Sequence, residues 1–171
     1  MPGKMTLCIP TLEEALNLLD KPHQFRGCPV CDGSLPPPVM FQRAIAAPAG
    51  SWCMPRMYFD EESREIVGSG GFKSEPKDRR VEIGYGVSPF RRCRGYATLG
   101  VKLLTEAAFL NGLVDEIYAE VSPTNEPSRR VLQKAGFSFS GVGTDDEGPV
   151  ELWSKKTGPG QAVQPTRSAH R

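Results

Sequence analysis

The sequence predicts a single α+β domain, in which helices pack on a mixed, mostly antiparallel sheet. Two observations lead to this prediction. The 171 residues are 39% apolar and 24% charged, which suits one globular domain with a sizeable core. Strand-like segments come first and are followed by a helix, a strand, a second helix and two closing strands. We place the domain at residues 1–156 and expect a disordered tail at 157–171, where Gly, Pro and polar residues dominate.

The N-terminal third contains one well-marked element. Thr11–Asp20 is expected to form a helix, because Thr11 can cap it and Glu14 stands in the capping-box position. The apolar face of this helix is expected to contain Leu12, Ala15, Leu16 and Leu19. Residues 21–55 contain several Gly, Pro and Ser clusters and predict loops around a single strand at Val39–Ala44.

Three strand-like segments occupy the middle of the chain. Arg56–Phe59 and Glu65–Phe72 flank a polar turn and predict a hairpin, and Val81–Val87 predicts a third antiparallel strand. Gly84 and Gly86 interrupt this third strand. A bulge or a close ligand approach is the usual reason for glycine inside a strand.

The C-terminal half is expected to begin with a long helix at Gly95–Asn111, which Gly112 is suited to end. Its buried stripe is expected to contain Leu99, Leu103, Leu104, Ala107 and Leu110. The remaining segments predict a strand at Glu116–Val121, a helix at Asn125–Ala135 and a closing hairpin at Phe137–Gly141 and Val150–Ser154.

Composition argues against several classes of function. The formal net charge is +1, but residues 1–154 carry 17 basic and 20 acidic side chains, and duplex nucleic acid would require a basic face. The five cysteines are odd in number, and no apolar leader or membrane-length apolar run is found, so we expect a cytoplasmic protein. Cys28 and Cys31 have CxxC spacing without a second ligand pair, and no metal site is expected.

The loop before the long helix is expected to bind an anion. Arg91, Arg92 and Arg94 immediately precede a helix start, where unpaired N–H groups and the helix dipole favour phosphate. The small residues Gly95 and Ala97 would allow close approach of ligand oxygens to the backbone. The alternative is that the three arginines form only a solvated face.

Two segments carry signatures of a known family. The run from Arg92 to Ala97, RCRGYA, resembles the Gln/Arg-x-x-Gly-x-Gly/Ala signature of the GNAT superfamily of N-acetyltransferases. The segment from Asn125 through Ser128 to Phe137 resembles the Asn-x-x-Ser…Gly-Phe element of the same superfamily, particularly its ribosomal-protein N-terminal acetyltransferase-like branch. The resemblance implies a GNAT-type sheet with helices on both faces.

The resemblance also implies acetyl-coenzyme A as the cofactor. Family members hold its pyrophosphate at the loop and helix start, and its pantetheine arm in a slot opened by a bulge in the preceding strand. The residues implied to contact it are Tyr85, Val87, Arg92, Cys93, Arg94, Gly95, Tyr96, Ala97, Thr98, Asn125 and Ser128. Asn125 would bind the pantetheine arm or serve as a helix N-cap. The backbone N–H of Val87 would stabilise the oxyanion.

The implied chemistry requires a base, because an amine must lose a proton before it attacks a thioester. Glu82 is similar in placement to the glutamate that histone-type members use as base; otherwise it is an ordinary strand residue paired with Arg80 or Lys77. Leu132 replaces the tyrosine that many members use as acid. Ser128 is then the implied substitute, or simply a first-turn residue bonded to backbone.

The resemblance therefore implies an N-acetyltransferase that acts on a primary amine by direct attack. A peptide N-terminus and a small-molecule amine both remain open as acceptors. The acidic turns at 60–62 and 145–147 would favour a cationic acceptor if they reach the cleft. We expect no nucleic-acid or membrane partner and a monomer or homodimer. The alternative is a catalytically inactive CoA-binding sensor or interaction module, suggested by Leu132.

Overall fold

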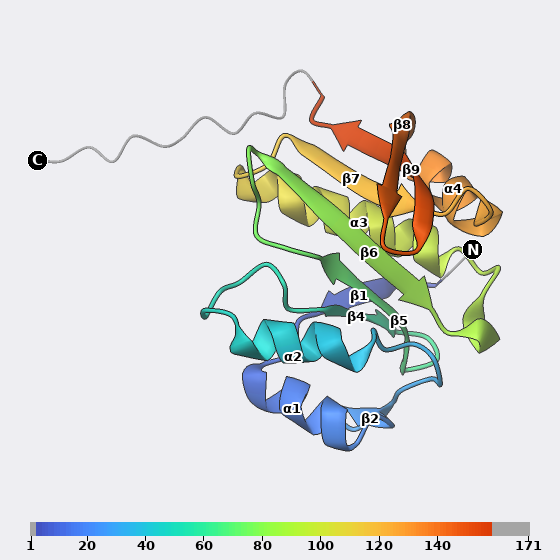
Figure 1. Ribbon diagram of the computed structural model, residues 1–171. Helices are drawn as coiled ribbons and strands as arrows, with labels where there is room; N and C mark the ends of the chain where they lie inside the picture. The colour runs from blue at the N-terminus through green and yellow to red at the C-terminus, as the bar shows by residue number, and fades with distance from the viewer. Residues whose placement is uncertain (1–2, 159–171) are drawn as a thin grey trace, which may run out of the picture.

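The computed structural model describes residues 3–158, and Figure 1 shows how its elements are arranged. In chain order these are β1 (Met5–Cys8), α1 (Leu12–Asp20), β2 (Gln24–Phe25), β3 (Cys28–Pro29), α2 (Pro38–Ala46), β4 (Arg56–Asp60), β5 (Glu65–Phe72), β6 (Arg80–Val87), the 3-10 helix η1 (Pro89–Arg91), α3 (Tyr96–Asn111), β7 (Glu116–Val121), α4 (Glu126–Lys134), β8 (Ser138–Asp145) and β9 (Gly148–Lys156). The tail expected at 157–171 lies outside the described residues except for its first two.

A seven-stranded sheet forms the centre, in the order β1-β4-β5-β6-β7-β9-β8. Its neighbouring strands are antiparallel except for β6 and β7, which are parallel. Strands β2 and β3 form a separate two-stranded ribbon. This arrangement confirms the expected mixed, mostly antiparallel α+β sheet.

Helices cover both faces of the sheet, as expected (Figure 1). On one face, α1 and α2 bury Leu18 and Phe41 against Ile66 of β5. On the other face, α3 and α4 share one core, in which Val101 and Leu132 pack with residues of β6, β7 and β9. Among the described residues, no helix is long and apolar enough to span a bilayer.

Helix α1 begins as its sequence predicts. The Thr11 hydroxyl accepts a hydrogen bond from the Glu14 N–H at 3.1 Å, and the Glu14 carboxylate accepts one from the Thr11 N–H at 2.8 Å. The expected apolar face is partly wrong, because Leu12 and Leu16 are about half exposed while Ala15 and Leu18 are buried. The helix is rotated so that its small Ala15 side faces the sheet and α2.

Helix α2 replaces the strand expected at Val39–Ala44. Pro38 stands in the first turn, where its fixed φ favours a helix and its missing N–H costs nothing. Phe41 and Ala44, three residues apart, are both buried, as one helical face requires. Short apolar runs fit either a helix or a strand, and packing against α1 decides between them here.

Helix α3 has the expected ends, because Gly95 and Gly112 both adopt the left-handed conformation, with φ of 82° and 77°. Its expected buried stripe is correct at Leu104, only half-buried at Leu99 and Leu103, and wrong at Ala107 and Leu110, which are exposed. Thr105 is buried instead and donates a hydrogen bond to the Val101 carbonyl at 2.7 Å. Gly100 explains the rotation, because its missing side chain admits the ring of Tyr58 against the helix.

Strands β6 and β7 separate after a short parallel stretch. Their pairing runs from Arg80 opposite Glu116 to Glu82 opposite Tyr118, whereas β6 continues to Val87. The β5–β6 register is continuous from Gly68–Val87 to Phe72–Ile83, so the expected bulge at the β6 glycines is wrong; the register shifts instead between β4 and β5, at Tyr58 and Phe59. Divergence of the two parallel strands, rather than a bulge, opens the sheet.

Candidate active site

Pairing of β6 with β7 ends at Glu82, and beyond it this edge of β6 has no strand partner within residues 3–158. The Lys73 N–H donates to the Glu82 carbonyl at 2.9 Å, and the Ser88 N–H donates to the Val67 carbonyl at 2.9 Å. Backbone groups of alternate residues point to opposite sides of a strand, so those of Tyr85 and Val87 point toward β7. Since pairing with β7 ends at Glu82, these two residues line a slot with backbone donors and acceptors.

The loop after β6 connects this strand to the start of α3, beside the slot. Cys93 and Gly95 both have positive φ, at 60° and 82°, and α3 begins at Tyr96. The first intrahelical bond joins the Leu99 N–H to the Gly95 carbonyl at 3.0 Å, so the N–H groups that precede it have no partner within the helix. Arg92 and Arg94 are exposed on this loop.

Two residues of the loop have structural tasks. Arg91 binds the Glu65 carboxylate at 2.6 Å and 3.2 Å, which ties the loop to β5. The Tyr96 side chain is buried and donates to the Asp60 carboxylate at 2.9 Å, so only its backbone faces the helix start. Asp60 is 3% exposed and not a solvated turn residue. Burial raises its pKa, but hydrogen bonds from Ser63 and Tyr96 outweigh burial and hold the pKa below its usual value.

Tyr85 and Ser128 meet across the slot. The Tyr85 hydroxyl lies 2.6 Å from Ser128 Oγ, which joins β6 to the first turn of α4. Burial raises the pKa of Tyr85, and the hydrogen bond with Ser128 partly offsets this rise. The Asn125 side chain caps α4 by accepting from the Ser128 N–H at 3.2 Å. Leu132 is fully buried in the core, so its position provides no acid.

Glu82 lies on the sheet face opposite α3 and α4, together with Gly84 and Gly86. Its carboxylate pairs with Lys73, not with either of the expected partners, since Arg80 pairs with Glu116. The Glu82 side chain is only 14% exposed. Burial raises its pKa above the ordinary value of 4.5, Lys73 opposes the rise, and the more distant carboxylates Glu120 and Asp145 add to it.

The structure therefore brings together most of the expected site residues around the β6–β7 slot. Val87 and Tyr85 line the slot, Ser128 in the first turn of α4 contacts Tyr85, Asn125 caps that turn, and the segment from Arg92 to Thr98 follows the end of β6. Lys73 is the participant that sequence reasoning missed. Because the β5–β6 register pairs Phe72 with Ile83, the next pair along this hairpin is Lys73 and Glu82, and a correct register would have revealed it.

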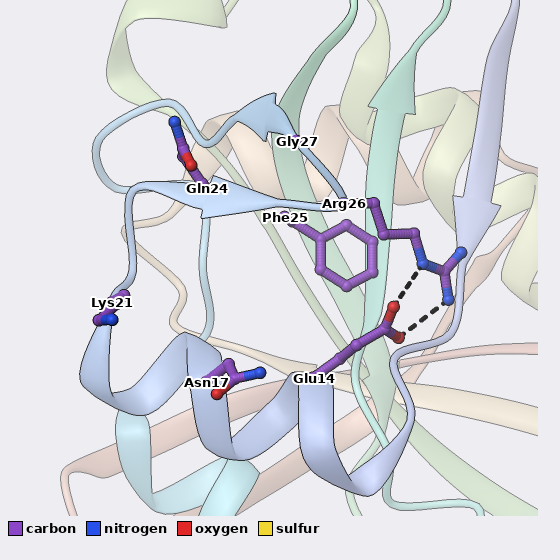
Figure 2. A pocket seen from close by; sticks show the side chains of 7 residues that line it. All are labelled: Glu14, Asn17, Lys21, Gln24, Phe25, Arg26 and Gly27. Atoms are coloured by element: carbon purple, nitrogen blue, oxygen red, sulfur yellow. Dashed lines mark hydrogen bonds and ion pairs between the residues drawn. The ribbon is translucent and has the colours of Figure 1, made fainter.

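A separate hollow lies between α1 and the β2–β3 turn (Figure 2). Glu14 and Arg26 stand at its wall, joined by hydrogen bonds of 2.7 Å and 3.0 Å. The hydrogen bond from Arg26 is the main cause that lowers the pKa of Glu14 to about 2. This hollow contains none of the expected site residues and lies away from β7 and α4 in Figure 1.

The family-model comparison agrees with the site geometry. The model of the acetyltransferase (GNAT) domain matches residues 39–138, more than half of the chain. The chain belongs to the GNAT acetyltransferase family. The matched region includes α2 to α4 and therefore the slot, the arginine loop and the Tyr85–Ser128 pair.

Curated GNAT relatives come from Bacillus. The uncharacterized N-acetyltransferase p20 of Bacillus licheniformis is 31% identical over 88 residues, which are 51% of this chain and 49% of that protein. The uncharacterized N-acetyltransferase YoaA of Bacillus subtilis is 34% identical over 82 residues, 47% of this chain and 46% of that protein. The chain thus spans about half the length of the curated relatives it matches.

Solved structures share the GNAT fold over nearly the whole chain. Aminoglycoside acetyltransferase AAC(6')-Ib in complex with coenzyme A has a TM-score of 0.65 and 22% identity, covering 96% of this chain and 100% of that one. A putative ribosomal-protein-serine acetyltransferase from Vibrio cholerae has a TM-score of 0.66 and 14% identity, covering 90% and 94%. At these identities the likeness concerns the fold.

Proposed function

We propose that this GNAT domain transfers an acetyl group from acetyl-coenzyme A to a primary amine by direct attack. The observation that carries the proposal is the β6–β7 slot, which lies between a helix start suited to an anion and the Tyr85–Ser128 pair. Glu82 lies on the other face of β6, which we propose as the acceptor groove. A long, thin cofactor with a phosphate end and a reactive thioester end fits this order of groups.

The pyrophosphate would bind at the start of α3. The N–H groups of Tyr96, Ala97 and Thr98 lie in the first turn, where helix geometry leaves them without intrahelical partners. Arg92 and Arg94 supply positive charge beside them. The positive φ of Gly95 turns the chain into the helix without the steric cost that a side chain would add.

The pantetheine arm would lie along the free edge of β6. The backbone groups of Tyr85 and Val87 face the slot, so amides of the arm can pair with them as an added strand would. Asn125 retains its side-chain N–H₂ donor for the arm while its oxygen caps α4. The Val87 N–H would donate to the oxyanion of the tetrahedral intermediate.

Glu82 would accept the proton of the incoming ammonium, directly or through a water. A general base works best when its pKa approaches the working pH, and burial moves the pKa of Glu82 in that direction. After attack, the C–S bond breaks and the departing thiolate takes a proton from the Ser128 hydroxyl. Tyr85, at 2.6 Å, restores this proton to Ser128 and regains one from solvent, into which the second proton of the acetylated nitrogen is released. The pair thus supplies the acid that Leu132 does not.

The acceptor would be a cationic amine, from a peptide N-terminus or a small molecule. The Glu120 and Asp145 carboxylates lie close enough to act on Glu82, and the three together place negative charge on the acceptor side of β6. Two solved acetyltransferases of similar fold illustrate both acceptor classes. One is named for aminoglycosides, and the other is named for ribosomal-protein serine. A panel of free amines and short peptides therefore tests the proposal.

Turnover is measured as release of the free CoA thiol from acetyl-CoA, with each amine of the panel. We expect at least one acceptor to accelerate thiol release and Glu82→Gln to lower that turnover about 100-fold. The matched control is Glu106→Gln, an exposed carboxylate on α3. If the protein bound acetyl-CoA but no amine accelerated release, the inactive CoA-binding module would replace the acetyltransferase proposal.

A further inference from the structure

Lys73 occupies the position that the ammonium of an acceptor would need. It directly follows β5, and its backbone N–H donates to the Glu82 carbonyl at 2.9 Å. Its Nζ pairs with the Glu82 carboxylate. The group proposed to deprotonate an acceptor amine thus already holds an amine that belongs to the protein.

The Lys73 side chain lies on the acceptor side of β6. A Cβ built on Gly84 would lie 3.5 Å from Lys73 Cε and 4.0 Å from its Cγ, so the aliphatic arm covers this glycine. A Cβ built on Gly86 would meet no atom within 4 Å among the described residues. No described side chain therefore covers Gly86, which lies between the Lys73 side chain and the end of β6.

The groups around the Lys73 ammonium are negatively charged, as a site for a cationic acceptor would be. The Glu120 and Asp145 carboxylates act on Glu82, and Glu82 itself is only 14% exposed. The Lys73 side chain is 44% exposed, so the protein does not enclose its ammonium. Lys73 follows β5, whereas Glu82, Glu120 and Asp145 belong to β6, β7 and β8, so only the folded domain brings these side chains together.

We propose that Lys73 is a self-acetylation site, modified on Nζ by acetyl-CoA bound to the same molecule. This inference rests on the proposed acetyltransferase function. Glu82 takes one proton from the Lys73 ammonium, and the neutral Nζ attacks the thioester carbonyl carbon. The N–C bond forms, the C–S bond breaks, and sulfur leaves with the bonding electrons. The attacking nitrogen loses its second proton, and the thiolate gains one. The products are the Lys73 acetamide and the CoA thiol, and Glu82 releases the first proton to solvent.

Acetylation of Lys73 would change the acceptor groove. The modified side chain carries no charge, so its ion pair with Glu82 is lost. Its amide would lie over Gly84, in the groove that an external acceptor must enter. The modification therefore affects both the base and the entrance to the site.

The test follows acetylation of each lysine by peptide mass spectrometry, in the full chain incubated with acetyl-CoA and no acceptor. Holding a nucleophile beside its target raises the rate far above that of free collision. We expect Lys73 to be labelled at least about tenfold faster than the exposed Lys77 and Lys102. The first-order rate constant should not depend on protein concentration, and Glu82→Gln should lower it about 100-fold.

Lys77→Arg is the matched control, since Lys77 lies in the same β5–β6 connection, and labelling should persist in it. Lys73→Arg keeps the positive charge and should abolish the fast labelling. Uniform labelling of lysines, or a rate proportional to protein concentration, would overturn the inference. If acetyl-CoA bound the protein and Lys73 stayed unmodified, the inference alone would fail. Absence of acetyl-CoA binding would instead contradict the proposed function.

Discussion

At the scale of single residues, the catalytic proposal depends on two contacts that join separate elements. Glu82 and Lys73 connect the end of β5 to β6, and Tyr85 and Ser128 connect β6 to α4. Sequence motifs suggested Glu82, Tyr85 and Ser128 individually. The partners depend on strand register and on the angle between β6 and α4, which no short motif encodes.

The pH dependence of turnover is predicted from Glu82. The ionised form is active as a base, so kcat/KM should fall as pH decreases through its pKa, which burial raises above 4.5. Lys73 lowers this pKa, and Lys73→Met should therefore move the acidic limb of the pH profile to higher pH. The profile of Lys77→Met should match that of the parent. An unchanged limb in Lys73→Met would contradict the assignment of Glu82.

Tyr85→Phe removes the hydroxyl that pairs with Ser128 but keeps the ring. We expect kcat to fall about tenfold, as loss of a hydrogen bond to a developing charge implies, with little change in acetyl-CoA affinity. Ser128→Ala should lower kcat by a similar factor. The decrease of kcat in the double variant should be much smaller than the product of the two single decreases. Additive losses in this double-mutant cycle would show that the two residues do not act as a pair.

At the scale of elements, helix α3 places the cofactor loop by packing tightly on the sheet. Gly100 contacts the ring of Tyr58, which is fully buried. Gly100→Ala should lower the free energy of unfolding by about 2 kcal/mol, because an added methyl overpacks this contact. Urea denaturation measures the change. Ala107→Gly, at an exposed position of the same helix, should cost only about 1 kcal/mol.

Elements with strong local signals were predictable, and those decided by packing were not. The capping box at Thr11 and the glycines at both ends of α3 set their helices correctly. The run Val39–Ala44 is apolar without a clear period, so contact with α1 made it helical. Strand β1 was not predicted, because four residues are too few to show alternation of apolar and polar side chains. Pairing with β4 fixes it as a strand. The slot was foreseen from family resemblance, but its cause, divergence of β6 and β7, was not.

At the scale of the whole molecule, carboxylates that gain ion pairs or hydrogen bonds on folding connect stability to pH, and Glu14, Glu65 and Asp60 are examples. Glu14 has its pKa lowered to about 2, chiefly by Arg26; Arg91 lowers the pKa of Glu65; and hydrogen bonds lower that of Asp60. Each contributes stability above its unfolded pKa and loses it as pH falls toward its folded pKa. The free energy of unfolding should therefore decrease from about pH 5 downward to about pH 2.

Urea denaturation at pH 7, 5, 4 and 3 measures this decrease. Glu14→Gln removes one of these contributions, so its stability should depend less steeply on pH than that of the parent. The control Glu13→Gln changes an exposed neighbour on α1 and should keep the parental slope. Equal slopes for the parent and Glu14→Gln would show that the Arg26 pair does not contribute.

The site as a whole joins two halves of the sheet, with β5 and β6 on one side of the slot and β7, α4 and the β8–β9 hairpin on the other. Calorimetric titration with acetyl-CoA tests this account most directly. The parent should bind with micromolar affinity, and Arg92→Ala with Arg94→Ala should weaken binding at least about tenfold. The control pair Arg43→Ala with Lys134→Ala removes the same charge from exposed positions on α2 and α4, and should bind as the parent does. Absence of binding by the parent, or equal weakening by both pairs, would contradict a cofactor site at the start of α3.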